Sequence, residues 1–410
     1  MTRILIKQRR RILNLDDHGK NSANYRKRKW LVGLSALGVT GVILSISLYA
    51  TNLSSSSSGS VSSTYLLNTL KLMPGASSGT AGQQSNSAQE VKHIVPLDQI
   101  VSGGPPPDGI PSIDNPKFLS VVDASKFLKD SDLVVGLTVN GQTQAYPLLI
   151  LVWHEIVNDK VGDLPVAVTY CPLCFTAQVF NRTISGHVAV EFGTSGKLYN
   201  NNLVMYDRLS GSLWSQALGE GIVGTHAGES LKRISFDVAY WKDWKQLYPN
   251  SMVLSTDTGF TRPYGVDPYG DYYTSDQLFF PISNLDKRLG LKEMVVGLDN
   301  EGQYKAYILH QIENSKVIND KVGNKPIALF SLYSRMVRAY SPIINSQTLD
   351  IQYNASTNKI LDKQTGSEWN FDGLALNGQL KGKQLTRLPF DEGFWFSWAA
   401  FHPQTRIYPG

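Results

Sequence analysis

The sequence predicts a mainly β fold (β-rich α+β), with two tandem copies of one domain after an N-terminal transmembrane helix and a disordered linker. Three observations support this prediction. One early segment carries no charge over 21 residues, ordered blocks of sequence occur twice, and short apolar or β-branched runs alternate with Gly and Pro turns. Such runs are typical of strands. With 42% hydrophobic and 18% charged residues, the 410-residue chain has a globular composition.

Basic residues are concentrated before the uncharged segment. Residues 1–29, the predicted basic cytoplasmic tail, hold ten Lys or Arg and two acidic residues, which gives a charge of +8. The whole chain has 39 basic and 34 acidic residues, so 29 basic and 32 acidic residues remain after position 29. The folded part has no basic excess to neutralise phosphates, and we expect no nucleic-acid partner.

The uncharged segment, residues 30–50, is long enough to cross about 30 Å of hydrocarbon as a helix. A basic RKRK run precedes it, and the next charge is Lys71. By the positive-inside rule the N-terminus is cytoplasmic, and the C-terminal domains of a single-pass cell-membrane protein lie outside the cytoplasm, anchored to the lipid bilayer. The alternative is a cleaved signal peptide, but the apolar run is long for one, and Leu48 stands where a small residue is required.

Residues 51–92 form a Ser/Gly-rich segment that cannot bury enough apolar surface to fold, so we expect a flexible linker. The remainder contains an internal duplication. The following blocks match in the same order: 136–148 with 297–309, 156–168 with 317–329, 207–214 with 362–369, and 236–251 with 390–405. This predicts a first repeat domain, a Gly/Pro/Tyr-rich connector and a second repeat domain at 93–255, 256–292 and 293–410.

The shared blocks predict particular elements. Asn140-Gly141 predicts the tight turn of a hairpin, and Ser210-Gly211 predicts another. Residues 166–170 are β-branched and apolar, as in a buried strand. Trp241 and Trp244 have helical spacing and predict one short helix per copy that packs its indoles onto a sheet. The Pro-rich segment 103–118 is expected to lie extended against the first domain, and the aromatic connector to form a packed surface loop or to line a cleft between the domains.

The chemically distinctive motif is Cys171-Pro-Leu-Cys174, between two predicted strands of the first repeat. These are the only cysteines of the chain. A Cys-Pro-x-Cys turn can direct both sulfurs to one point. Soft thiolates suit copper(I), zinc or iron–sulfur chemistry. A thioredoxin-type pair normally opens a helix, whereas here a strand follows. A disulfide across so short a loop would stabilise the fold by only about 2 kcal/mol. Metal binding, thiol redox and an inert pair all stay open.

The second copy provides an internal comparison, because it keeps the turn and core residues but lacks the candidate ligands. When the blocks are aligned, the positions of Cys171, Cys174, His154 and Met205 are taken in the second copy by Leu332, Arg335, Ser315 and Ile360, in that order. The fold therefore does not require the first copy's residues. We predict that a thiophilic metal ion, copper or zinc, is held by Cys171, Cys174, His154 and Met205. The alternatives are a hydrogen-bonded structural histidine and a core methionine. Glu155 is a candidate base, and Asn200, Asn201 and Asn202 are candidate lining residues.

Several strings, in order over 108–408, resemble the bacterial and archaeal domain-of-unknown-function family 3179. They are DGIPSIDNPKF, AYPLLILVWHEIVND, PVAVTYCPLC, SGKLYNNNLVMYDRLSGSLWSQ, DPYGDYY and FWFSWAAFHPQT. The resemblance implies an extracytoplasmic, often membrane-attached protein and no particular activity. Our first hypothesis is a membrane-anchored extracytoplasmic protein that binds a metal or exchanges thiols at the Cys pair. The alternative is a non-enzymatic binding module with a disulfide-bonded pair. A hydrolase or transferase has little support, because no HExxH motif or phosphate-binding loop occurs.

Overall fold

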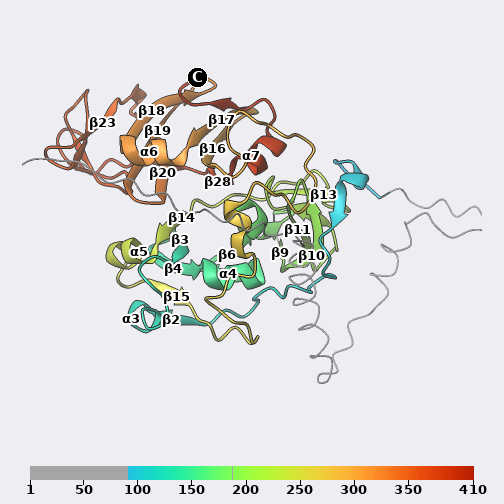
Figure 1. Ribbon diagram of the computed structural model, residues 1–410. Coiled ribbons are helices and arrows are strands. Elements are labelled where there is room, and N and C mark those ends of the chain that lie inside the picture. Colours follow the sequence, from blue (N-terminus) through green and yellow to red (C-terminus); the bar gives the residue numbers. More distant parts are fainter. Residues whose placement is uncertain (1–90, 187) are drawn as a thin grey trace, which may run out of the picture.

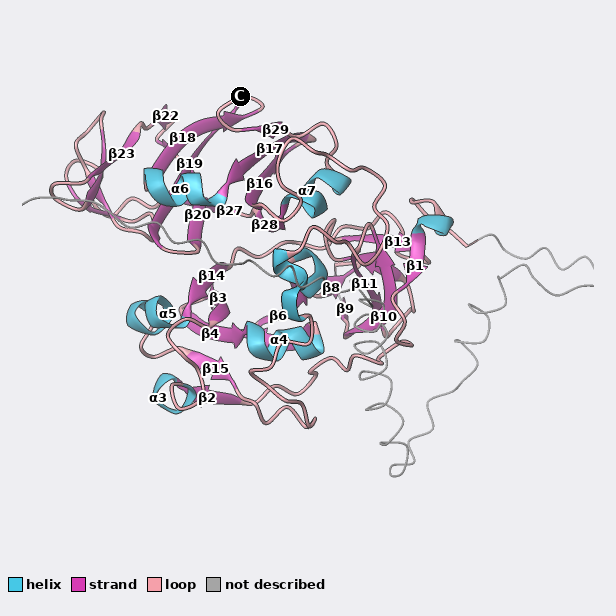
Figure 2. Cartoon of the chain, viewed as in Figure 1, coloured by secondary structure: helices cyan, strands magenta, loops and turns pink. Residues whose placement is uncertain are grey.

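The computed structural model describes residues 91–186 and 188–410 (Figure 1). The predicted cytoplasmic tail, the transmembrane helix at 30–50 and the linker up to residue 90 lie outside the described residues. Within the described ranges, no helix is both long and apolar enough to span a bilayer. The described chain is mainly β, as predicted, with a few short helices (Figure 2).

The N-terminal half (91–255) contains three main sheets. The first consists, in spatial order, of β14 (Asp237–Tyr240), β3 (Leu133–Val139), β4 (Gln142–Pro147), β15 (Met252–Leu254) and β2 (Phe118–Ser120). The second consists of β5 (Ile156–Val161), β6 (Leu164–Cys171) and β7 (Thr176–Asn181). The third consists of β1 (Ile100–Ser102), β10 (Phe192–Tyr199), β11 (Asn202–Asp207), β12 (Leu213–Ser215) and β13 (Glu220–Val223). A small ladder joins β8 (Thr183–Ile184) to β9 (Val188–Ala189).

The C-terminal half (293–410) has three main sheets in which the shared strands follow the same order, although each sheet differs from its counterpart by one strand. Its first sheet consists of β28 (Asp391–Phe394), β16 (Met294–Asn300), β17 (Gln303–Ile308) and β29 (Arg406–Ile407), and its second of β18 (Val317–Val322), β19 (Lys325–Tyr333), β20 (Met336–Ser341) and β27 (Thr386–Leu388). The third consists of β23 (Ile351–Asn354), β24 (Lys359–Asp362), β25 (Glu368–Trp369) and β26 (Ala375–Asn377), and β21 (Ile343–Ile344) pairs with β22 (Gln347–Thr348). The first sheet of each half contains one parallel pair. In the N-terminal half β15 runs parallel to β4, and in the C-terminal half β29 runs parallel to β17.

Local sequence explains several of these elements. Asn140 and Gly141 both have positive φ, 50° and 78°, as the predicted tight turn between β3 and β4 requires. Gly136 leaves room for the indole of Trp244: a Cβ at this glycine would lie 2.0 Å from the ring. The same fit joins Gly297 to Trp398, where the distance would be 2.3 Å. Each half therefore locks one helix onto its first sheet through a glycine–tryptophan pair.

The two predicted helices are α5 (Trp241–Leu247) and α7 (Trp395–Phe401). The expectation of one short helix per copy is wrong, because each half has another, α4 (Leu148–His154) or α6 (Leu309–Ser315). The sequence LLILVWH of α4 is apolar almost throughout and mostly buried, so it shows no helical period. Shorter pieces are α3 (Val121–Ala124), η1 (Leu97–Gln99), η2 (Pro172–Cys174) and η3 (Gly270–Thr274).

The two halves meet through two reciprocal contacts, β7 against β28 and β14 against β20. Figure 1 shows β20 and β28 on the side of the C-terminal half that faces the N-terminal half. The contacts share an ion-pair pattern: Arg233 lies 2.6 Å from Asp391, and Arg387 lies 2.5 Å from Asp237. The first of the two contacts lies directly beside the cysteine motif.

Candidate functional site

The two cysteines stand at the two ends of the η2 turn. Cys171 ends β6 and pairs in register with Thr176, the first residue of β7. Phe175 has a left-handed conformation, with φ of 53°, and this returns the chain into β7. Both thiols are free and buried. The Cys174 thiol donates to the backbone oxygen of Asn201 at 3.1 Å, and the Cys171 sulfur lies 4.0 Å from the same oxygen. Both sulfurs therefore face one carbonyl.

The two thiols differ in acidity. Burial raises the pKa of Cys171 well above its usual value, and the neighbouring Cys174 adds to this effect. Burial also raises the pKa of Cys174, but hydrogen bonds from Cys171, Ser397 and Asn202 to its thiolate outweigh burial and lower the pKa overall. The first proton to leave the pair is thus that of Cys174, and the Cys171 thiol then stabilises the thiolate.

Glu155 is a buried carboxyl close to this pair. It directly follows α4 in a left-handed conformation, and its backbone oxygen accepts from the Tyr170 amide at 2.8 Å, which holds it beside the end of β6. Burial raises the pKa of Glu155 to about 8. Its charge in turn raises the pKa of both Cys171 and Cys174. A carboxyl that titrates near neutral pH beside a thiol pair can take up or return protons during thiol chemistry.

The connector covers the thiols. The Tyr272 hydroxyl, which is buried, donates to the Leu173 backbone oxygen at 2.9 Å and accepts from the Asn201 side chain at 3.2 Å. The same Asn201 side chain accepts from the Phe280 amide at 3.1 Å. The Asn201 side chain thus binds two residues of the connector, and the Asn201 backbone oxygen faces the two sulfurs. The aromatic connector packs as a lid on the motif.

The C-terminal half closes the site from the other side. A Cβ at Gly393 of β28 would lie 2.3 Å from the Thr176 methyl group and 3.0 Å from the Cys174 backbone oxygen. Only a glycine lets the two backbones approach so closely. Ser397, in the first turn of α7, contributes the hydroxyl that lowers the pKa of Cys174. The site is therefore built from both halves and the connector.

His154 lies on α4 and is fully occupied by hydrogen bonds. Its Nδ1 is 2.7 Å from the Pro111 backbone oxygen, and its Nε2 is 2.7 Å from the Tyr264 hydroxyl. A carbonyl only accepts, so Nδ1 carries the proton and Nε2 accepts from Tyr264. Burial lowers the pKa of His154 to about 4, which keeps the ring neutral. Both nitrogens are engaged, so no lone pair is left for a metal ion.

The residues predicted as metal ligands are only partly brought together. Met205 is fully buried in the same core cluster as Cys171 and Cys174. His154 does not join them in a ligand set, since the described part of the chain holds no group of three or more His, Cys, Asp or Glu side chains placed for a metal ion. Metal binding by the thiol pair stays a prediction.

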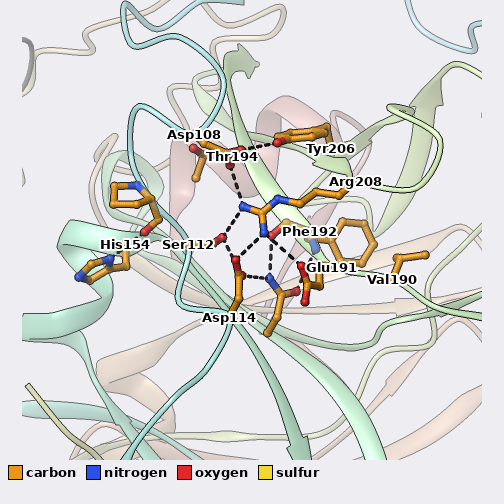
Figure 3. A network of polar contacts seen from close by, with 12 residues as sticks. Asp108, Ser112, Asp114, His154, Val190, Glu191, Phe192, Thr194, Tyr206 and Arg208 are labelled. Atoms are coloured by element: carbon orange, nitrogen blue, oxygen red, sulfur yellow. Dashed lines mark hydrogen bonds and ion pairs between the residues drawn. The ribbon is translucent and has the colours of Figure 1, made fainter. Parts of the chain in front are cut away.

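His154 belongs instead to the network that holds the Pro-rich segment, which lies against the domain as expected (Figure 3). Arg208 of the segment after β11 donates to Asp108 at 3.1 Å, to Ser112 at 3.0 Å and to Asp114 at 2.5 Å. The Pro111 carbonyl meets His154 between these anchors. The contacts of this histidine are those of the hydrogen-bonded structural residue that the sequence left open as the alternative to a metal ligand.

Comparison with known proteins agrees with the resemblance in sequence. A family model described as "Protein of unknown function (DUF3179)" matches residues 107–405. The chain belongs to this family. No curated protein and no solved structure matches the chain. The DUF3179 match spans most of both halves, the whole connector and most of the Pro-rich segment, so the thiol site lies wholly within the family region.

The strand register of this DUF3179 protein also corrects one position in the comparison of the two halves. Thr169 pairs with Gln178 and Phe330 pairs with Arg338, but eight residues separate the first pair and seven the second. Arg335, with φ of 64°, directly precedes β20 as Phe175 precedes β7. Arg335 therefore corresponds to Phe175 and not to Cys174. The C-terminal turn is one residue shorter.

Sequence reasoning missed the lid residue Tyr272 and the hydroxyl of Ser397. Tyr272 lies about a hundred positions after the cysteines and Ser397 more than two hundred, and neither stands in a motif that marks a thiol site. The run of three asparagines was a usable signal. Asn201 and Asn202 lie at the thiols. Asn200 instead accepts from the Ser283 amide at 2.7 Å.

Proposed function

We propose that this DUF3179 protein is a membrane-anchored, extracytoplasmic thiol redox protein in which Cys171 and Cys174 cycle between a dithiol and a disulfide. The observation that carries the proposal is the pairing of two unequal buried thiols with a carboxyl, Glu155, whose pKa is about 8. An inert thiol pair needs neither a difference in acidity nor a proton acceptor near neutral pH.

The chemistry follows thiol–disulfide exchange with a disulfide-containing oxidant. The Cys174 thiolate attacks one sulfur of the oxidant, forms a mixed disulfide and expels the other sulfur as a thiolate. Cys171 then gives its proton to Glu155 and attacks Cys174, which releases the second sulfur. Two electrons pass to the oxidant, and the protein keeps a Cys171–Cys174 disulfide. The reverse sequence reduces a partner disulfide. Since both thiols are buried, the lid at Tyr272 has to open for either direction.

The proposed location suits this chemistry. A basic tail before the uncharged segment 30–50 supports a cytoplasmic N-terminus and an extracytoplasmic site. Disulfides form and persist outside the reducing cytoplasm, so oxidised partners are available there.

We also propose that the two halves are tandem copies of one domain. The matching strand orders, the paired Gly136–Trp244 and Gly297–Trp398 contacts and the sequence blocks support this. In this proposal the C-terminal copy has no redox pair. It completes the wall of the site in the first copy, through the close approach of Gly393 and the hydroxyl of Ser397.

A second candidate function is the binding of a thiophilic ion such as copper(I) or zinc. The observation that favours it is Met205, a soft thioether buried in the same cluster as both thiols. In this function the two sulfurs and Met205 would hold the ion, without His154.

The test is a redox titration of the purified full-length chain in detergent. The chain is equilibrated with reduced and oxidised glutathione mixtures, and free thiols are counted by mass after alkylation. We expect both thiols to disappear together at one midpoint. Thiols that stay reduced in every mixture but are protected by stoichiometric copper(I) would favour the metal site. A pair that stays oxidised in every mixture would favour a structural disulfide.

A further inference from the structure

One hairpin turn of the C-terminal half carries a motif that the thiol chemistry does not use. The turn joins β23 to β24, and residues 354–356 read Asn-Ala-Ser. An asparagine followed two positions later by Ser or Thr, with no Pro between them, is the acceptor sequence for N-linked glycans. Because so short a triplet also occurs by chance, the geometry of the turn has to decide whether it can act as an acceptor.

The turn lies on the surface and is closed by its own residues. All positions from 354 to 359 are exposed, whereas the next residue, Ile360, is buried. The Tyr353 hydroxyl donates to Asn358 Oδ1 at 2.6 Å, and Asn358 has a left-handed conformation with φ of 55°. Figure 1 shows β23 at an outer edge of the C-terminal half. The turn is therefore well formed and leaves room for a large attached group.

Asn354 and Ser356 form one hydrogen-bonded unit. Asn354 Oδ1 accepts from the Ser356 amide at 3.0 Å, from the Ser356 hydroxyl at 2.6 Å and from the Thr357 amide at 3.1 Å. All three bonds end on the oxygen, and Asn354 Nδ2 makes no hydrogen bond to any residue that the structure describes. The nitrogen that receives a glycan is thus available on the surface, and the serine hydroxyl lies beside the same carboxamide.

The corresponding turn of the N-terminal half is covered. It joins β10 to β11 and contains Asn200 and Asn201, which are 5% and 0% exposed. Their side-chain oxygens accept from the amides of Ser283 and Phe280 in the connector. The connector therefore uses up the polar groups of this turn, whereas the turn at 354–358 keeps its own at the surface.

A second triplet of the same kind serves as an internal comparison. Asn181-Arg182-Thr183 also fits the acceptor sequence, but Asn181 is the last residue of β7 and is partly buried. The Asn181 amide donates to the Lys232 backbone oxygen at 2.8 Å, and its side chain accepts from the Thr183 amide at 2.9 Å. A residue held in this way inside a sheet is not accessible to a transferase. A third triplet, at 52–54, lies outside the described residues.

We propose that Asn354 is an N-glycosylation site. The co-reactant is an oligosaccharide linked through phosphate to a membrane polyprenol. Asn354 Nδ2 forms a bond to C1 of the first sugar while the bond from C1 to the phosphate oxygen breaks. The lipid phosphate leaves with the electron pair, and one of the two Nδ2 protons passes to a base of the transferase. The transfer takes place outside the cytoplasm, so this inference rests on the proposed extracytoplasmic location.

The test uses the full-length chain made in cells of its native source and purified from their membranes in detergent. Trypsin cleaves after Arg338 and Lys359, so the peptide 339–359 contains the acceptor, and fragmentation that retains sugars locates the modification. We expect most copies of this peptide to carry a sugar mass on Asn354. The peptide 161–182, which contains the comparison triplet, should carry none. An unmodified peptide 339–359 overturns the inference, whatever the state of the other peptide.

Matched variants separate glycosylation from a plain structural turn. Asn354→Asp keeps the oxygen that closes the turn and removes only the nitrogen. We expect the sugar mass to be lost completely in Asn354→Asp and in Ser356→Ala, and to remain in Ser356→Thr, which keeps the hydroxyl. A sugar mass that persists in Asn354→Asp would be attached to another residue of the peptide, and it overturns the inference.

Protease added to the same cells reports the location of the C-terminal half independently. An unmodified Asn354 in a chain that the protease cleaves from outside overturns the glycosylation site alone. An unmodified Asn354 in a chain that stays protected overturns both the glycosylation site and the proposed location. The glutathione titration tests the proposed redox function separately, so the failures are distinguishable.

Discussion

Gln178 and Arg338 hold corresponding positions on β7 and β20, and each donates to the corresponding aspartate across the contact between the halves, Asp391 or Asp237. The two contacts differ in what they bury. Arg338 is 2% exposed and carries a full charge, and Asp237 beside it is buried as well. Burial raises the pKa of Asp237, but the charges of Arg338 and Arg387 outweigh it and lower the pKa overall. The same framework thus carries a buried arginine–aspartate ion pair at one contact and a neutral glutamine–aspartate hydrogen bond at the other.

Arg338→Leu should therefore destabilise the protein strongly. Removal of one partner of a buried ion pair typically costs about 3–5 kcal/mol, since the remaining charge loses its partner. Arg387 still meets Asp237, so we expect the lower end of that range. Urea unfolding followed by tryptophan fluorescence measures the loss. Gln178→Leu is the matched control and should cost only about 1 kcal/mol, as expected for a single hydrogen bond. Equal losses in both variants would contradict the assignment.

The carboxyl of Glu155 should make stability depend on pH. Its pKa is about 8 in the folded chain against an ordinary value of 4.5, so the folded state binds more protons between these pH values. Stability from this group is fully present below pH 4.5 and is lost as the pH rises to about 8. Glu155→Gln removes this dependence. The difference in unfolding free energy between variant and parent should be near zero at pH 4.5 and grow to a few kcal/mol in favour of the variant at pH 8. A constant difference over this range would exclude Glu155 as a titrating group.

Gly393 keeps β28 against the thiol turn, and Gly393→Ala should push them apart. The added Cβ would lie 2.3 Å from the Thr176 methyl group, closer than any relaxed contact. We expect faster native-state alkylation of the two cysteines, by about tenfold, because partial opening exposes buried thiols in proportion to its population. Gly290→Ala is the control, since a Cβ there meets nothing within 4 Å and should leave the alkylation rate unchanged. An unchanged rate in both variants would mean that β28 does not limit access.

Much of this fold could be predicted from the sequence, because its signals are local. The Asn140-Gly141 turn, the strand before the cysteines and the helices at Trp241 and Trp395 all follow from short-range patterns. The site could be predicted only in part. The spacing of Cys171 and Cys174 identifies them in the sequence. The groups that cover the thiols and shift the pKa of Cys174 come from the connector and from α7, which only tertiary packing brings near. For His154 the sequence left two roles open. It stands next to Glu155 in sequence, but its ring bonds the Pro-rich segment, and this contact between distant parts of the chain leaves no local pattern.

The membrane topology gives an independent prediction. If residues 30–50 span the bilayer with the +8 tail inside, all described residues lie outside the cytoplasm. Protease added to intact cells should then remove the C-terminal part, as detected by an antibody against residues near 400. A tag at the N-terminus should stay protected until the cells are lysed. Protection of both ends would contradict the topology.

The last prediction concerns Cys171→Ser together with Cys174→Ser. The C-terminal half builds the same hairpin, β19 to β20, with no cysteine in its turn, and Arg335 adopts the left-handed conformation that Phe175 adopts in the first turn. The hairpin therefore depends on the strands and on the left-handed residue, not on sulfur. We expect the double variant to fold, with a loss of about 1–2 kcal/mol, because serine hydroxyls replace two buried thiols and can still donate to the Asn201 carbonyl. Circular dichroism and urea unfolding measure this, and the glutathione titration should show no remaining redox change. A double variant that does not fold would assign the pair a structural role, in which a disulfide or a bound metal ion is required for the first domain.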